Sequence, residues 1–213
     1  MCYNKDISLY TYFIGLVASF LLIQKKDKDL KIVGCFFLVV IHMQLIEYFL
    51  WTNNKCNMRN ITLSYIGAII LYIQPIILYL AIVYYNKKLY IKYKKILDTI
   101  IIIYIIGLII NFINLIPIDC TNVTKISFPY LQWSWLYQKK DEILPFIFPI
   151  SIILLAYYGL SSSYNLYLSL ICIISFIVSY IIYSKQRIFG TLWCWFAVFI
   201  PIGVLLIDTF KNL

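Results

Sequence analysis

Seven apolar segments of 17 to 25 residues account for most of the chain, and they limit the folds open to it more than any other feature. They cover residues 7–24, 32–51, 61–85, 96–116, 143–159, 164–183 and 188–207. A helix of about 20 residues crosses the hydrocarbon core of a bilayer, and a helix satisfies its own backbone polar groups there. We therefore predict an all-α, polytopic integral membrane bundle of about seven transmembrane helices, forming a single domain over residues 1–213.

The composition supports this class and argues against a soluble one. Hydrophobic residues make up 63% of the chain and charged residues only 13%. The net charge of +9 suggests nucleic-acid binding at first, but the lysines stand in short clusters between apolar segments. That placement is typical of topology signals in membrane proteins, and no polar basic domain is present. We therefore expect the lipid bilayer, and no nucleic acid, as a partner.

The loops predict an orientation with the N-terminus outside. The first segment has no basic flank and no Ala-x-Ala cleavage site, so we expect a retained helix rather than a removed signal peptide. Ten of the 18 lysine and arginine residues fall in segments that this orientation places inside, and eight fall outside. The two glycosylation sequons, which begin at Asn60 and Asn122, lie outside, as do Cys2, Cys56 and Cys120.

Two kinds of covalent modification are expected on the outer loops. Asn122 is the better glycan acceptor, because Asn60 adjoins the third segment. Cys56 and Cys120 lie in successive outer loops, where a disulfide can form in an oxidising compartment. Cys2 competes for this pairing. The cysteines within the apolar segments are expected to be packing residues: Cys35, Cys172 and Cys194.

Polar side chains at the end of segment 32–51 stand where hydrocarbon is expected. Gln44, Glu47 and Trp51 recur at i, i+3 and i+7 and share one face of a helix. An ionisable group at membrane depth costs about 2.5 to 3.5 kcal/mol on insertion scales, so Glu47 must face a partner, a cavity or water. It marks either a functional site, at which protons are exchanged, or a structural hydrogen bond between helices. Trp51 is equally well explained as an anchor at the membrane interface.

Other polar residues extend this candidate site. Gln74 precedes Pro75 within the third segment, and a proline in a helix interior frees a carbonyl group that a neighbour must satisfy. Gln74 therefore lines a cavity or makes a hydrogen bond between helices. Asn111 and Asn114 stand about one helical turn apart in the fourth segment. His42 points about 140° away from Glu47 on the same helix, which favours a packing role.

The sequence lacks the residues that several kinds of membrane-protein chemistry require. Segment 188–207 contains no lysine, so it cannot form a retinal Schiff base. Zinc enzymes need about three histidine or cysteine-type ligands, and His42 is the single histidine of the chain. Neither a phosphate-binding glycine loop nor a Gly-x-Ser-x-Gly hydrolase motif is present. We expect no cofactor, no metal and no enzymatic activity.

Three short motifs lie in different segments: Met43-Gln44-x-x-Glu47-x-x-x-Trp51, Gln74-Pro75 and Trp193-Cys194-Trp195. Together they resemble an uncharacterised family of small multi-pass membrane proteins of large DNA viruses and protists. The resemblance implies a viral or protist membrane protein, in a viral or host membrane, with Gln44, Glu47 and Trp51 as family positions. It implies no activity.

The sequence leaves three functions open. We favour a transporter-like or channel-like bundle with a buried polar site around Glu47 that passes a proton or a small solute. The second hypothesis is a structural or interaction protein that binds a protein partner, or another copy of itself, through the aromatic loop 117–142. The third and least favoured is a lipid-modifying enzyme that uses Glu47 as a base.

Overall fold

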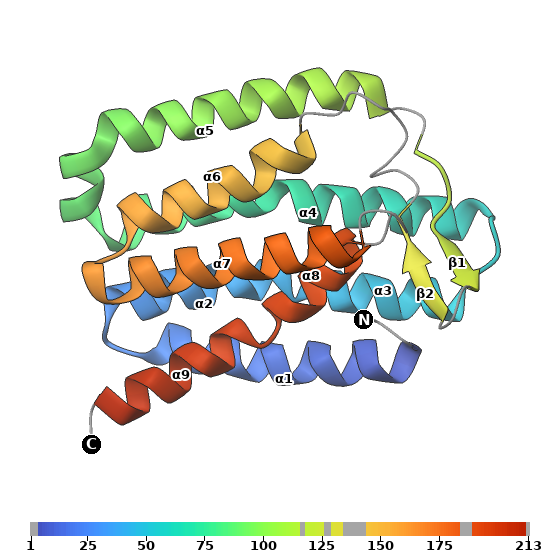
Figure 1. The fold of residues 1–213 in the computed structure, drawn as a ribbon, viewed down its shortest axis with the longest axis horizontal. Helices are drawn as coiled ribbons and strands as arrows, with labels where there is room; N and C mark the ends of the chain where they lie inside the picture. Colours follow the sequence, from blue (N-terminus) through green and yellow to red (C-terminus); the bar gives the residue numbers. More distant parts are fainter. Residues whose placement is uncertain (1–3, 116–117, 126–128, 134–143, 184–188, 212–213) are drawn as a thin grey trace.

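The protein is an all-α helical bundle with one small β-hairpin (Figure 1). The computed structural model describes residues 4–115, 118–125, 129–133, 144–183 and 189–211. The helices are α1 (Lys5–Gln24), α2 (Lys28–Val40), α3 (His42–Thr52), α4 (Met58–Tyr85), α5 (Lys87–Leu115), α6 (Leu144–Gly159), α7 (Ser162–Tyr183), α8 (Phe189–Ala197) and α9 (Ile200–Lys211). Strands β1 (Asn122–Lys125) and β2 (Pro129–Gln132) pair antiparallel.

The expected all-α bundle is therefore confirmed, and most of the apolar segments coincide with helices. By length and composition, four helices of the described part are able to cross a membrane: α1, α2 and α3 taken together, α4 and α7. Shorter apolar helices lie within α6 and α9. These helices are compatible with a membrane protein.

The last segment differs from the expectation of one continuous helix over residues 188–207. It is divided into α8 and α9, with a turn at Val198 and Phe199. Pro201 has no N–H to donate to the carbonyl of Ala197, so the helical ladder is interrupted at this point. The two helices consequently run at an angle to each other (Figure 1).

Helix α5 begins nine residues before the expected start at residue 96. Its first residues are lysine-rich, and the backbone leaves helical geometry at Tyr93, where φ is −112° and ψ is 19°. Asp98 lies just beyond this kink. Its Oδ1 accepts hydrogen bonds from the Tyr79 hydroxyl at 2.7 Å and the Tyr90 hydroxyl at 3.3 Å.

Asparagine and aspartate side chains cap the N-termini of several helices. The Asn4 side chain accepts a hydrogen bond from the N–H of Ile7, Asp27 accepts from the N–H of Leu30, and Asn57 accepts from the N–H of Asn60. Helix α4 continues through Pro75. The buried Tyr104 hydroxyl of α5 donates to the carbonyl of Tyr72 at 2.6 Å, so a neighbouring helix supplies a donor close to the proline.

Helices α2 and α3 form the centre of the bundle and contact α1, α4 and α8. The face of α1 that packs on them carries small residues, namely Ser8, Thr11, Gly15, Ala18 and Ser19, followed by Leu22. Small residues let helix backbones approach closely, as is common between membrane helices. At Gly34 of α2, an added Cβ would lie 2.8 Å from the carbonyl oxygen of Ser19.

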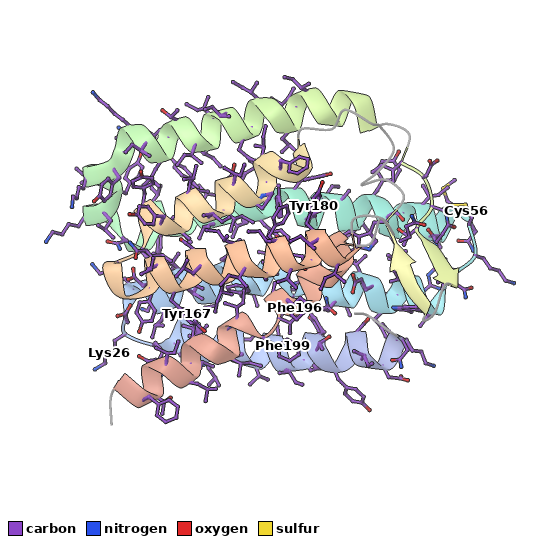
Figure 2. All side chains as sticks on the ribbon, in the orientation of Figure 1. Lys26, Cys56, Tyr167, Tyr180, Phe196 and Phe199 are labelled. Carbon is purple, nitrogen blue, oxygen red and sulfur yellow. A yellow bond between two sulfur atoms is a disulfide. The ribbon has the colours of Figure 1, made fainter. Side chains whose placement is uncertain are left out.

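The two ends of the bundle differ in chemistry. We call one the lysine end. It contains the α1–α2 loop, the junction of α4 with α5 and the turn between α6 and α7 (Figure 1). The opposite hairpin end carries β1, β2 and the start of α4. Figure 2 labels Lys26 at the first end and Cys56 at the other.

Candidate functional site

A group of buried polar side chains lies where α1, α3 and α8 meet. Gln44 and Glu47 of α3 are both 0% exposed. The Thr11 hydroxyl of α1 lies 3.1 Å from Oε1 of Gln44 and 2.8 Å from the carbonyl oxygen of Ile7, and either can accept its hydrogen. Cys194 of α8 lies close enough to Glu47 for their side chains to interact electrostatically. We call Thr11, Gln44, Glu47 and Cys194 the polar cluster.

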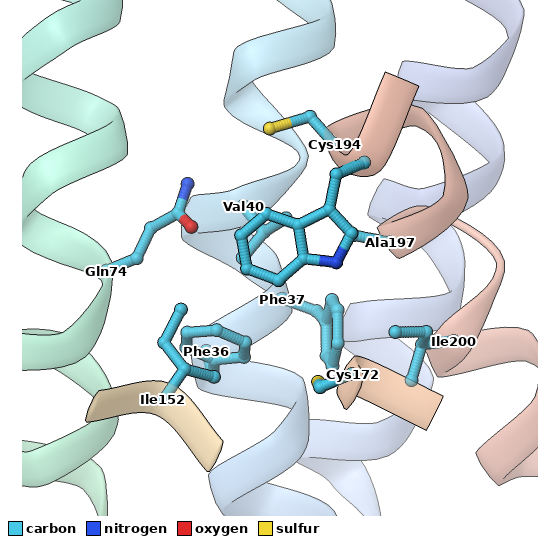
Figure 3. Close-up of a pocket in the computed structure, with 10 residues that line it drawn as sticks. Phe36, Phe37, Val40, Gln74, Ile152, Cys172, Cys194, Ala197 and Ile200 are labelled. Atoms are coloured by element: carbon cyan, nitrogen blue, oxygen red, sulfur yellow. The ribbon is translucent and has the colours of Figure 1, made fainter. Parts of the chain in front are cut away.

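A cavity adjoins the polar cluster on the side of α4 (Figure 3). Cys194 and Gln74 both line it, and the remaining lining is apolar, formed mainly by Phe36, Phe37 and Trp193. The cavity has room for a water-sized molecule. Figure 3 shows the Gln74 amide turned toward the side formed by Val40 and Cys194.

Gln74 is the polar group that faces this space. Its side chain is buried, and Nε2 has no hydrogen-bond partner among the residues that the structure describes. A buried amide N–H that lacks a partner costs about 1 to 3 kcal/mol, and a molecule bound in the cavity would remove that cost. The Trp193 indole, in contrast, donates to the hydroxyl of Ser175 at 3.0 Å.

The other residues expected at the site are not members of the polar cluster. Trp51 is half-buried at the end of α3, and its Nε1 has no partner within the described part of the chain. Asn111 and Asn114 belong to α5, which packs on α4 and α6, and their side chains lie outside the described residues. The Nδ1 of His42 lies 2.6 Å from the Leu38 carbonyl oxygen, in keeping with a packing histidine.

The hairpin end contains a second buried polar network. Asn60 is 0% exposed, and its Nδ2 donates to the carbonyl oxygens of Asn53 and Thr121 at 3.1 and 3.0 Å. Its Oδ1 accepts from the N–H of Thr121 at 2.9 Å. A glycan on Nδ2 would replace one of these hydrogen bonds inside the protein. The geometry therefore argues against Asn60 as a glycan acceptor, whereas Asn122 is exposed.

A disulfide joins Cys56 to Cys120, with Cα atoms 5.5 Å apart, and thus connects the start of α4 to the segment before β1. Cys2, the expected competitor, lies outside the described residues. Cys172 and Cys194 are buried and Cys35 is half-buried; all three are free thiols. Within the described residues, no three His, Cys, Asp or Glu side chains are placed to hold a metal ion.

Two members of the polar cluster were not predicted. Thr11 lies on the small-residue face of α1, and that stripe was a usable signal for a helix packed tightly against a neighbour. Cys194 was assigned to packing alone. Its nearness to Glu47 depends on how α8 crosses α3, which no spacing within one helix reveals.

Fold and site together define a class, an all-α bundle with helices long and apolar enough for a membrane and a polar cluster in its interior. Comparisons with protein-family models, with curated proteins and with solved structures found no match. The family resemblance of the three motifs therefore stays a prediction.

Proposed function

We propose that the chain is a multi-pass integral membrane protein of seven spans, with its N-terminus outside, that passes a proton or a small solute at the polar cluster. The observation that carries this proposal is Glu47, a carboxyl group wholly buried in the centre of the bundle, which acts electrostatically on Cys194 in the wall of the cavity. Ionisable groups inside membrane bundles are costly, and they commonly mark ion or substrate pathways.

The outer surface of the helices supports the membrane part of this proposal. Large apolar side chains are exposed along α1, α5 and α7, among them Phe13, Ile106 and Ile174, each more than half exposed. Soluble monomers rarely expose contiguous apolar patches of this extent. Lipid tails would cover these faces, while the lysine end and the hairpin end would lie in the two head-group layers.

The polar cluster and the cavity support a transport pathway better than they support a purely structural hydrogen bond between helices. A single hydrogen bond would be enough to link two helices. Here polar groups of α1, α3 and α8 form the polar cluster, and Cys194 of that cluster lines a cavity together with Gln74 of α4. Gln74 still has a hydrogen to donate into that space. Movement of a proton or small polar molecule past Glu47 would use both features.

Proton flux in reconstituted liposomes tests the proposal. Purified protein is placed in vesicles that contain a pH-sensitive dye, and a pH gradient is imposed. We expect flux from the wild type and background flux from Glu47→Gln, because the neutral amide cannot exchange a proton. The matched control is Asp119→Asn, which neutralises an exposed carboxyl group at the hairpin end and should leave the flux unchanged.

The outcomes separate the remaining hypotheses. A folded Glu47→Gln protein with wild-type flux, or a wild type that passes neither protons nor small solutes, would contradict the proposal. Binding of a protein partner that depends on loop 117–142 and not on Glu47 would support the interaction hypothesis. The disulfide favours this second candidate to some degree, because it holds the hairpin firmly against the bundle end. Altered lipid species on expression would indicate an enzyme.

A further inference from the structure

Five lysines crowd the first residues of α5, and we call them the lysine patch. They are Lys87, Lys88, Lys92, Lys94 and Lys95, and all five are exposed. Among the residues that the structure describes, none of them lies within 4.0 Å of a carboxylate. Lys92 is instead 4.8 Å from the centre of the Tyr93 ring. The patch therefore presents five positive charges without internal compensation.

The carboxylates at the same end are engaged elsewhere. Asp98 accepts from Tyr79 and Tyr90, and Asp208 pairs with Lys25 at 2.8 Å. Asp27 caps α2, and the buried Asp29 accepts hydrogen bonds from the side-chain amide of Asn86 and from the N–H of Ser161. The lysine patch therefore attracts anions from outside the chain.

The backbone places the patch at the border between the charged end and the apolar surface. Only Asn86 separates α4 from α5, and the kink at Tyr93 turns the first part of α5 away from the axis of the rest (Figure 1). Large apolar side chains just before the patch and within it are strongly exposed, with Tyr84 at 73% and Ile91 at 72%. Charged and apolar groups side by side are typical of segments that lie in a membrane interface.

We propose that the lysine patch binds the phosphate groups of anionic phospholipids. The inference rests on the membrane insertion in the proposed function and adds a lipid class to it. Clustered lysines beside a membrane helix attract anionic lipids. The exposed side chains of Ile96, Ile102 and Ile103 continue from the patch along α5, so one lipid can set its head group on the lysines and its chains on the helix.

Native mass spectrometry tests this proposal on the full chain. The protein is held in detergent micelles with equal amounts of phosphatidylcholine and phosphatidylglycerol, and the bound lipids are counted. We expect phosphatidylglycerol to be bound in excess by the wild type. Replacing all five lysines of the patch by glutamine should lower that excess at least about tenfold, while replacing them by arginine should preserve it.

Controls separate the patch from net charge and from free anions. Lys5→Gln with Lys55→Gln removes exposed charge outside the patch and should leave the excess unchanged. Phosphatidylglycerol, but not inorganic phosphate, should also raise the unfolding temperature of the wild type, a result that needs no variant. Equal binding of both lipids, or an equal effect of inorganic phosphate, would overturn the proposal. Release of the protein from membranes by alkaline carbonate would instead contradict membrane insertion and the proposed function.

Discussion

Gly34 shows how one residue sets the distance between two helices. Its Cα faces α1 at a point where an added Cβ would lie 2.8 Å from Ile23 Cγ1 and 2.8 Å from the Ser19 carbonyl oxygen. The backbone of α1 cannot move aside without disturbing its small-residue face. The contact between α1 and α2 therefore depends on the absence of a side chain here.

We expect Gly34→Ala to destabilise the protein by about 1 to 3 kcal/mol, because an extra methyl group in a well-packed contact forces the helices apart. Thermal unfolding in detergent measures the change. The matched control is Gly107→Ala, where the added Cβ meets Ile147 Cδ1 at an ordinary 3.4 Å and alanine gains helix propensity. If both variants unfold at the same temperature, the close approach at Gly34 has no energetic role.

Sequence reasoning at the residue scale succeeded within single helices and failed between them. The spacing of Gln44 and Glu47 placed both on one face, and both are buried. Asn60 was read as a glycosylation sequon, but its amide is used inside the protein, because the Thr121 backbone approaches it from 61 residues away. No local pattern encodes such a contact.

At the scale of elements, the apolar segments predicted where helices occur. The structure departs from them where segment 32–51 is divided between α2 and α3, where segment 188–207 is divided between α8 and α9, and at the start of α5. Pro201 interrupts the helix in the last segment. The first residues of α5 are rich in lysine and were therefore interpreted as a loop. The hairpin lies within residues 117–142, which were expected only as an aromatic loop. Its register pairs Asn122 with Gln132, and no alternation of apolar residues in so short a stretch predicted it.

The disulfide is an element-scale constraint, because it holds the hairpin to the start of α4. Replacing Cys56 and Cys120 by serine should lower the stability by about 2 to 4 kcal/mol, the usual contribution of a bond that closes a long loop. Thermal unfolding with and without a reductant measures it. The reductant should shift the wild type to the level of the double variant and leave that variant unchanged. A Cys35→Ser variant, which keeps the disulfide, serves as the control.

At the scale of the whole molecule, chemistry is divided between the two ends of the bundle. The lysine end carries the lysine patch, and the hairpin end carries the disulfide and the exposed Asn122. The sequence predicted this division from the order of the loops alone, because successive helices of a bundle run in opposite directions. It did not predict which helices are neighbours. That α2 and α3 form the centre depends on side-chain shapes from several helices at once.

Glycosylation tests the orientation of this division. In cells of a host with a secretory pathway, we expect a glycosidase-sensitive mass shift that Asn122→Gln removes and that Asn60→Gln leaves in place. Asn122 is exposed on β1, and Asn60 is buried. Thr124→Ala, which removes the sequon but keeps Asn122, should act like Asn122→Gln. A shift that depends on Asn60 would contradict the structure, and the absence of any glycan would leave the N-out orientation without support from this assay and favour its reverse.

Asp29 links parts of the chain that the ribosome makes at very different times. Its carboxylate accepts a hydrogen bond from the side-chain amide of Asn86, at the junction of α4 with α5. It also accepts one from the N–H of Ser161 in the turn between α6 and α7, 132 residues further along the chain. During synthesis, the Ser161 partner of this carboxylate becomes available only after α6 has been made. The lysine end is thus completed late, and its contacts with Asp29 can form only in the order in which the chain is made.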